Sequence, residues 1–152
     1  MTAPAPAKYV YSPKDAVLGA GVQTQFRLKD ATTWTPVQGV LAIGQVGEKT
    51  GTVEQHTLED TSKRYIAGMF DGPDKELKGQ FYPDDVGQTA FIEAAKAGKN
   101  VIVSHIWPDG VTATYELTLL GYMRDETQNE KTIGWIVPGK QSGKTYWGKL
   151  AA

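Results

Sequence analysis

The stretch from Gly139 to Thr145 comes nearest to a known chemistry. Its sequence, Gly-Lys-Gln-Ser-Gly-Lys-Thr, contains the lysine and hydroxyl of a phosphate-binding loop. The spacing does not fit that motif, because the first glycine comes one residue too late and Pro138 stands in its place. We therefore expect a flexible basic arm here and not a nucleotide site.

Other reactive side chains are scattered. The histidines, His56 and His105, lie on separate predicted strands, which favours ordinary sheet positions over a metal or acid–base pair. Adjacent acids, Asp84 and Asp85, are better explained by helix capping than by paired-carboxylate chemistry. The remaining candidates match no calcium or nucleophile motif; they are Asp71, Asp74, Glu76, Ser12, Ser62, Ser104 and Ser142. We expect no catalytic set, no cofactor, no metal site and no enzyme.

The tryptophans allow two interpretations. Exposed aromatic side chains on a β-sandwich can stack on sugar rings, whereas buried ones belong to a core or a subunit interface, where tryptophan is enriched. The residues concerned are Trp34, Trp107, Trp135 and Trp147. Core or interface positions are favoured, and carbohydrate binding stays open as the alternative.

Composition places the chain among globular proteins. The 152 residues suit one domain, and a net charge of -1 from 16 basic and 17 acidic residues argues against a dedicated nucleic-acid-binding domain. With 0 cysteines, disulfides are excluded. No apolar run has the length of a membrane span, and Met1–Ala7 lacks the features of a signal peptide. We expect synthesis in a cytoplasm and no membrane span.

The residues from Gly79 to Met123 organise the predicted fold. They predict a strand, one helix at about 85–98, a strand, an Asp-Gly hairpin turn and another strand. Asp85 suits the helix N-cap and Gly98 the left-handed position after the last turn. The proposed buried face of the helix is Val86, Ala90, Phe91 and Ala94. Such a helix must lie against a sheet.

Alternating and β-branched patterns predict the remaining strands. They span Leu18–Leu28, Trp34–Val46, Thr52–Leu58, Glu76–Tyr82, Asn100–Trp107, Val111–Leu119 and Thr132–Val137. The predicted architecture is mostly β, a two-sheet antiparallel sandwich or barrel with one flanking α-helix and extended terminal arms. It forms one domain over 1–152, with an N-terminal arm at 1–15, a β-core at 16–137 and a C-terminal arm at 138–152.

Several segments resemble the tail tube proteins of long-tailed phages in their order and spacing. The segments are Trp34–Val40, Ile43–Gly47, Thr57–Gly68, Glu76–Phe81 and Pro83–Ala97, and the resemblance covers roughly Leu18 to Thr118. The chain departs from the family pattern at Met69-Phe70, where a polar residue is more common. The resemblance implies two packed β-sheets with a flanking helix, in a structural protein of the virion tail.

The same resemblance implies an assembly. The chain would pair with itself in homo-hexameric rings that stack into a tube, through which DNA passes into the host without specific binding. Other tail proteins at the tube ends and a tape measure protein would be its further partners. The alternatives are the inner tube of a contractile tail or secretion system, and a monomeric carbohydrate-binding decoration module.

Two surfaces are candidates for this assembly. The long connection Glu59–Lys75 contains clustered apolar residues, and we expect it to bridge one ring to the next because exposed apolar patches usually mark interfaces. Its contact residues would be Tyr65, Ile66, Met69 and Phe70. Lumen candidates are the polar positions of two strands expected to share a surface, namely Glu54, His56, Glu76, Lys78 and Gln80.

Overall fold

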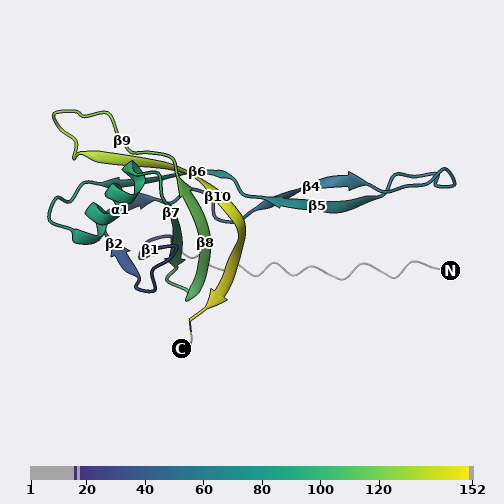
Figure 1. Cartoon of the computed structure of the whole chain (residues 1–152), viewed down its shortest axis with the longest axis horizontal. Coiled ribbons are helices and arrows are strands. Elements are labelled where there is room, and N and C mark those ends of the chain that lie inside the picture. The colour runs from purple at the N-terminus through teal and green to yellow at the C-terminus, as the bar shows by residue number, and fades with distance from the viewer. Residues whose placement is uncertain (1–15, 17, 151–152) are drawn as a thin grey trace.

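The computed structural model describes residue 16 and residues 18–150, and its main body is an antiparallel barrel (Figure 1). Seven strands follow one another around it in the order β2, β1, β7, β8, β10, β6, β3. Their bounds are Gln23–Leu28 for β1, Thr35–Val37 for β2, Val40–Ala42 for β3, Asp74–Gln80 for β6, Asn100–Ile106 for β7, Val111–Leu119 for β8 and Gly134–Lys149 for β10. A short strand, β9 (Met123–Arg124), pairs with β10 beside this path. The predicted mostly-β fold is confirmed.

The edge strands of the barrel, β2 and β3, are consecutive in the chain. The short turn between them brings the two edges together and nearly closes the barrel. Gly39 turns the chain between them at a φ of 77°, so the predicted single strand Trp34–Val46 is interrupted there. Gln88, fully buried, joins the strand ends: its amide donates to the carbonyls of Gln38 (2.9 Å) and Gln80 (2.7 Å). Short edges tied down in this way are protected against unwanted pairing.

The helix α1 (Val86–Lys96) lies against the barrel, as predicted (Figure 1). Asp85 is its N-cap, because the Asp85 carboxylate accepts the backbone N–H of Gln88 at 3.1 Å. Gly98 follows the helix with a φ of 69°, the left-handed conformation that glycine adopts without strain. Both helix ends are therefore those indicated by the sequence.

The predicted buried face of α1 is only half right. Phe91 and Ala94 are buried, whereas Val86 and Ala90 are exposed. The cause lies at Gly87, whose backbone approaches the carbonyl of Pro36 so closely that a Cβ there would overlap it. This contact turns Gly87 toward β2, which points Val86 outward; the other buried helix residues are Gln88, Ile92 and Ala95.

The apolar core lies between α1 and the barrel wall. The ring of Phe91 is 5.2 Å from the ring of Phe26 on β1 and 6.0 Å from that of Trp135 on β10, measured between centroids. Alternating positions of β7 and β8 complete the core, as the period-two pattern of the sequence predicted. These positions are Val101, Val103, Tyr115, Leu117 and Leu119.

A two-stranded hairpin leaves the barrel on the side away from α1 (Figure 1). Its strands are β4 (Lys49–Glu54) and β5 (Tyr65–Asp71), which among the described strands pair only with each other. The prediction of a long connection over Glu59–Lys75 is therefore wrong: β5 and the start of β6 occupy most of it. The true turn is 55–64, at the tip.

The predicted C-terminal arm is also wrong. Residues 138–149 belong to β10, which pairs with β8 on one side and β6 on the other and so forms part of the barrel wall. Gln141 and Thr145, both in that predicted arm, are buried. The predicted N-terminal arm, 1–15, lies outside the described residues.

Candidate functional site

The residues first considered for chemistry lie apart. His56 is in the exposed tip of the hairpin, whereas His105 is inside the barrel. Asp74 is 3.4 Å from the ammonium of Lys140, which gives it an ordinary surface role. Among the described residues, no group of His, Cys, Asp or Glu is arranged to hold a metal ion. In that same part of the chain, no helix has the length and apolar character needed to cross a bilayer.

The phosphate-loop-like stretch is part of a strand and not a loop before a helix. Residues 139–145 lie within β10, whose pairing with β8 shifts register between Ser142 and Tyr146. Gly143 takes a φ of 74° within this bulge. The backbone N–H of Thr145, instead of facing a phosphate, donates to the carboxylate of Glu48 at 3.0 Å.

The inside of the barrel has a polar part. Buried His105 is 3.0 Å from the Thr24 hydroxyl at Nδ1 and 2.7 Å from the Tyr115 hydroxyl at Nε2. Burial, with a smaller contribution from the charge of Lys75, lowers the pKa of His105 to about 3, so this imidazole is neutral. Burial likewise lowers the pKa of Lys75 to about 8; its ammonium lies 4.2 Å from the Tyr115 ring centroid. These groups hold one another in place inside the barrel.

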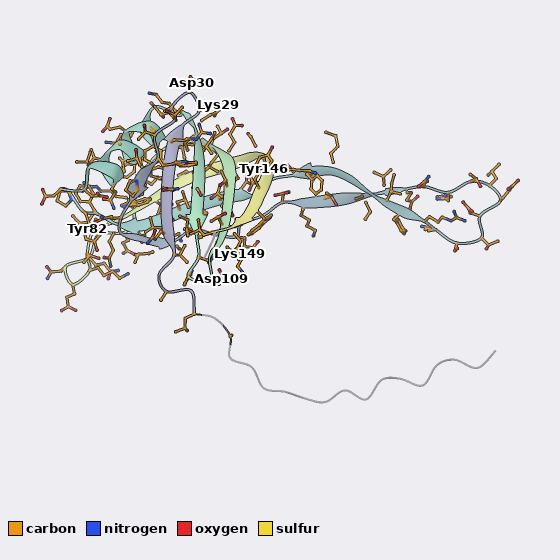
Figure 2. All side chains as sticks on the ribbon, turned by 90° about the horizontal axis from the view of Figure 1, so that it is seen from below. Lys29, Asp30, Tyr82, Asp109, Tyr146 and Lys149 are labelled. Carbon is orange, nitrogen blue, oxygen red and sulfur yellow. The ribbon has the colours of Figure 1, made fainter. Side chains whose placement is uncertain are left out.

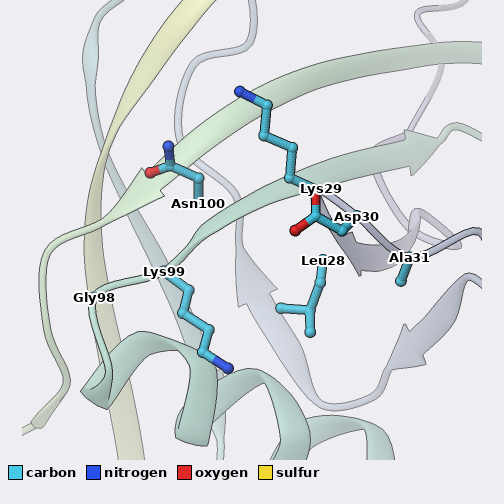
Figure 3. A pocket seen from close by; sticks show the side chains of 7 residues that line it. All are labelled: Leu28, Lys29, Asp30, Ala31, Gly98, Lys99 and Asn100. Atoms are coloured by element: carbon cyan, nitrogen blue, oxygen red, sulfur yellow. The ribbon is translucent and has the colours of Figure 1, made fainter.

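A surface depression lies between the turn after β1 and the start of β7 (Figure 3). Lys29 and Lys99 at its rim point away from each other. The Lys29 ammonium instead lies 3.2 Å from the carboxylate of Glu116. The lining contains no nucleophile beside a base, so it offers no catalytic arrangement.

The hairpin carries the most unusual surface of the described chain. All four predicted contact residues are on β5, and their exposed fractions are 53% for Tyr65, 50% for Ile66, 91% for Met69 and 49% for Phe70. Side chains leave both faces of the ribbon into open space (Figure 2). Ile66 pairs across the ribbon with Val53, which is also exposed. The predicted apolar cluster thus lies on a hairpin that projects from the barrel (Figure 1), and within the described part of the chain only Phe70, at the base of β5, is placed against a barrel residue, Lys144.

The predicted lumen residues fall into two groups. Glu54 and His56 are on the hairpin, where the Glu54 carboxylate lies 3.8 Å from the Lys63 ammonium. The other three are on the outward face of β6: Glu76 and Lys78, exposed and 3.9 Å apart, and half-buried Gln80. Because β4 pairs with β5 and not with β6, the expected common surface of the two groups is wrong.

The tryptophans differ in their surroundings. Trp135 is buried in the core, and its indole N–H donates to the carbonyl of Gln80 at 3.1 Å. Trp107 and Trp147 stack with ring centroids 6.0 Å apart, and Trp147 is 56% exposed. Trp34 lies under the guanidinium of Arg27. Core packing therefore accounts for only one of them.

Sequence reasoning missed the base of the hairpin. We call the segments 45–49 and 71–73 the hairpin root; they contact the bulge of β10. Glu48 and Gly72 make the closest of these contacts. The glycines and single charges of the root are also typical of an ordinary turn. The root could therefore have been recognised only from its contacts with β10, a strand that the sequence did not predict at this point.

Comparison with known proteins identifies the class. A family model described as the phage tail tube protein family matches residues 17–150, nearly the whole chain. The chain belongs to the phage tail tube protein family. It is therefore a structural component of a virion tail and not an enzyme, and the predicted resemblance is confirmed. No curated protein sequence matches it significantly.

Solved structures agree with this assignment at the level of the fold. The tail of an empty GTA particle, refined with C6 symmetry, is 14% identical with a TM-score of 0.68, over 90% of this chain and 100% of that one. The SPP1 tail tube is also 14% identical, with a TM-score of 0.67 over 90% and 81%. A sheath–tube complex of the PVC extracellular contractile injection system is 7% identical, with a TM-score of 0.59 over 84% and 89%. The fold is thus shared by tail tubes and by a contractile system.

Proposed function

We propose that copies of this chain form hexameric rings that stack into a tail tube, the channel through which DNA leaves the virion. Family membership and the sixfold symmetry of the similar GTA tail support this proposal. The barrel supports it too, since its edge strands are short, whereas β4 and β5 of the hairpin each leave a longer outer edge unpaired within the described chain. The proposed partners are further copies, the proteins at the tube ends and a tape measure protein.

The hairpin carries the proposal. A two-stranded ribbon is marginal alone in water, and this one exposes apolar side chains on both faces. A ribbon of this kind gains stability when a neighbouring copy covers it. We assign Tyr65, Ile66, Met69 and Phe70 to contacts between copies in adjacent rings, with the two aromatic residues as anchors.

The double substitution Tyr65→Ser with Phe70→Ser tests this role. The purified variant should remain folded by circular dichroism, because neither side chain belongs to the barrel core. In sedimentation and negative-stain electron microscopy it should give subunits or single rings where the parent chain gives long tubes. The matched control, Thr50→Ser with Thr52→Ser on the partner strand, should form tubes normally. Long tubes from the Tyr65/Phe70 variant would contradict the role.

We also propose that the outward face of β6 lines the channel. The paired charges of Glu76 and Lys78 give that face mixed sign, and phosphate binding depends on unpaired Lys and Arg. The proposal assigns Glu54 and His56 to the hairpin contact instead. Virions carrying Glu76→Lys should form tubes of normal length yet eject DNA more slowly. Glu93→Lys, at an exposed helix position, is the control; equal ejection rates in both variants would contradict the lumen assignment.

A further inference from the structure

The hairpin root rests on the bulge of β10 through several independent contacts. Gln141 donates its backbone N–H to the carbonyl of Pro73 at 3.4 Å. Gly72 is buried against the same residue; a Cβ at Gly72 would lie 2.6 Å from the Gln141 carbonyl oxygen. The ammonium of Lys144, within the bulge, lies 4.0 Å from the ring centroid of Phe70 on β5. The root and the bulge therefore fit together at close range.

Glu48 is at the centre of this contact. Its carboxylate oxygen Oε2 accepts the backbone N–H of Thr145 at 3.0 Å and the side-chain amide of Gln141 at 3.4 Å. That amide also donates to the Thr145 hydroxyl at 2.8 Å, so the three residues form a connected network. Burial acts to raise the pKa of Glu48, but the hydrogen bonds from Thr145 and Gln141 and the charge of Lys144 outweigh it and hold the pKa below its usual value.

The bulge provides the donor that this carboxylate needs. Within a regular ladder a strand N–H is used by its neighbour, but between Ser142 and Tyr146 the pairing of β10 with β8 is broken. The N–H of Thr145 is thereby free to point at the root. An ionised acceptor on a backbone N–H makes a stronger bond than a neutral one.

We propose that Glu48 is the clamp that fixes the direction of the β4–β5 hairpin, by holding its root on the β10 bulge before any copy meets another. Within the described residues, β4 and β5 pair with no barrel strand, so the root meets the barrel through Val46, which packs against the core, and through its contacts with β10. A two-stranded ribbon without the clamp would swing about its root. Fixing it in advance removes an entropy cost from association. This last benefit rests on the proposed role of the hairpin as an inter-copy contact.

The full-length chain offers a direct test because it contains 0 cysteines. Glu59→Cys at the hairpin tip and Lys149→Cys at the end of β10, both exposed, accept spin labels without any background. Pulsed electron–electron double resonance on unassembled subunits then gives the distribution of distances between the label at the hairpin tip and the label on the barrel. Tube growth of unlabelled subunits, followed by light scattering and electron microscopy, is measured separately.

The clamp predicts a specific order among variants. Glu48→Ala should widen the distance distribution at least about twofold and slow tube growth roughly tenfold, the loss expected for one charge-assisted contact. Glu48→Gln keeps an oxygen that accepts from Thr145 but loses the charge, so it should fall between the parent and Glu48→Ala in both measurements. The control is Glu54→Ala, which removes a carboxylate that pairs with Lys63 within the hairpin itself and should leave the distribution unchanged.

The outcomes separate the clamp from the proposed function. An unchanged, narrow distribution in Glu48→Ala overturns the clamp, whatever the tubes do. Equal widening in Glu48→Ala and Glu48→Gln overturns the assignment to the Thr145 hydrogen bond. Widening in Glu48→Ala alone, together with normal tube growth, supports the clamp and contradicts the role of the hairpin in stacking.

Discussion

The barrel and the hairpin are both made of antiparallel strands, but they hold their side chains in opposite ways. In the barrel, every second residue of β8 from Ala113 to Leu119 is buried against the core. In the hairpin, nearly every position of β4 and β5 is exposed. Barrel side chains therefore stabilise the subunit itself, whereas those of the hairpin become stabilising only when something else covers them.

A matched pair of phenylalanines should show the largest difference between the two regions. Phe91→Ala removes a ring that is 2% exposed and contacts Phe26 and Trp135, so it should lower the free energy of unfolding by about 3–5 kcal/mol. Phe70→Ala, at 49% exposure, should cost less than about 1 kcal/mol. Urea denaturation of unassembled subunits measures both; similar losses would mean that the hairpin belongs to the same cooperative core.

Lys75 should show that the barrel interior also contains a destabilising group. Its pKa is about 8 when folded and near 10.5 in an unfolded chain, so between these values only the unfolded state holds the proton. Stability should then rise as the pH increases from about 8 toward 10.5, and below pH 8 the chain bears a penalty on the order of 3 kcal/mol, reduced by the contact with Tyr115.

Lys75→Met should therefore raise the free energy of unfolding at pH 7 and abolish the increase between pH 8 and 9.5. Urea denaturation at several pH values across this range measures the free energy of unfolding. The range stops below the pH at which tyrosines of the unfolded chain ionise, so their titration does not contribute to the slope. His105 and Tyr115, the titratable groups beside Lys75, keep their protons unchanged over that range in the folded state. Lys78→Met, at an exposed position of the same strand, should leave the slope as it is. If the free energy of unfolding of the parent chain does not change between pH 8 and 9.5, the prediction of a buried Lys75 ammonium is wrong.

Two glycines give the smallest contrast. Gly87→Ala would place a Cβ against the carbonyl of Pro36 and should cost about 1–3 kcal/mol as the helix shifts off β2. Gly51→Ala in β4 meets no atom within 4 Å and should be neutral or slightly stabilising. Thermal denaturation of the two variants measures this difference. If Gly87→Ala has no effect, the helix packs less closely against β2 than the structure shows.

Sequence patterns predicted the elements whose signals are local. The cap at Asp85, the glycine at 98 and the alternation of β8 each depend on near neighbours, and all three are correct. By contrast, β10 was missed beyond Val137, because its inward positions there are Gly139 and Gln141 and it contains a proline. The strand nevertheless forms there because β10 pairs with β6 and with β8, which are both far away in sequence.

The residues of the candidate contact surface were predicted from the sequence, but their secondary structure was not. The apolar character of the segment from Tyr65 to Phe70 indicated an interface, yet its strand structure was hidden because Gly68 interrupts the pattern and neither face is buried. Glu48 could not be selected from the sequence at all, since its partners are about a hundred residues away, on a strand that was itself not predicted.

The position of β10 in the chain has a consequence for biosynthesis. This strand joins β8 to β6 and seats the hairpin root, yet it leaves the ribosome after every other strand described. A nascent chain that ends before it has an open sheet with two unpaired long edges and no seat for Glu48. Domains generally fold as units, and pairings between distant segments form slowly. Under the proposed tube assembly, a nascent chain would therefore become able to polymerise only after β10 has been translated.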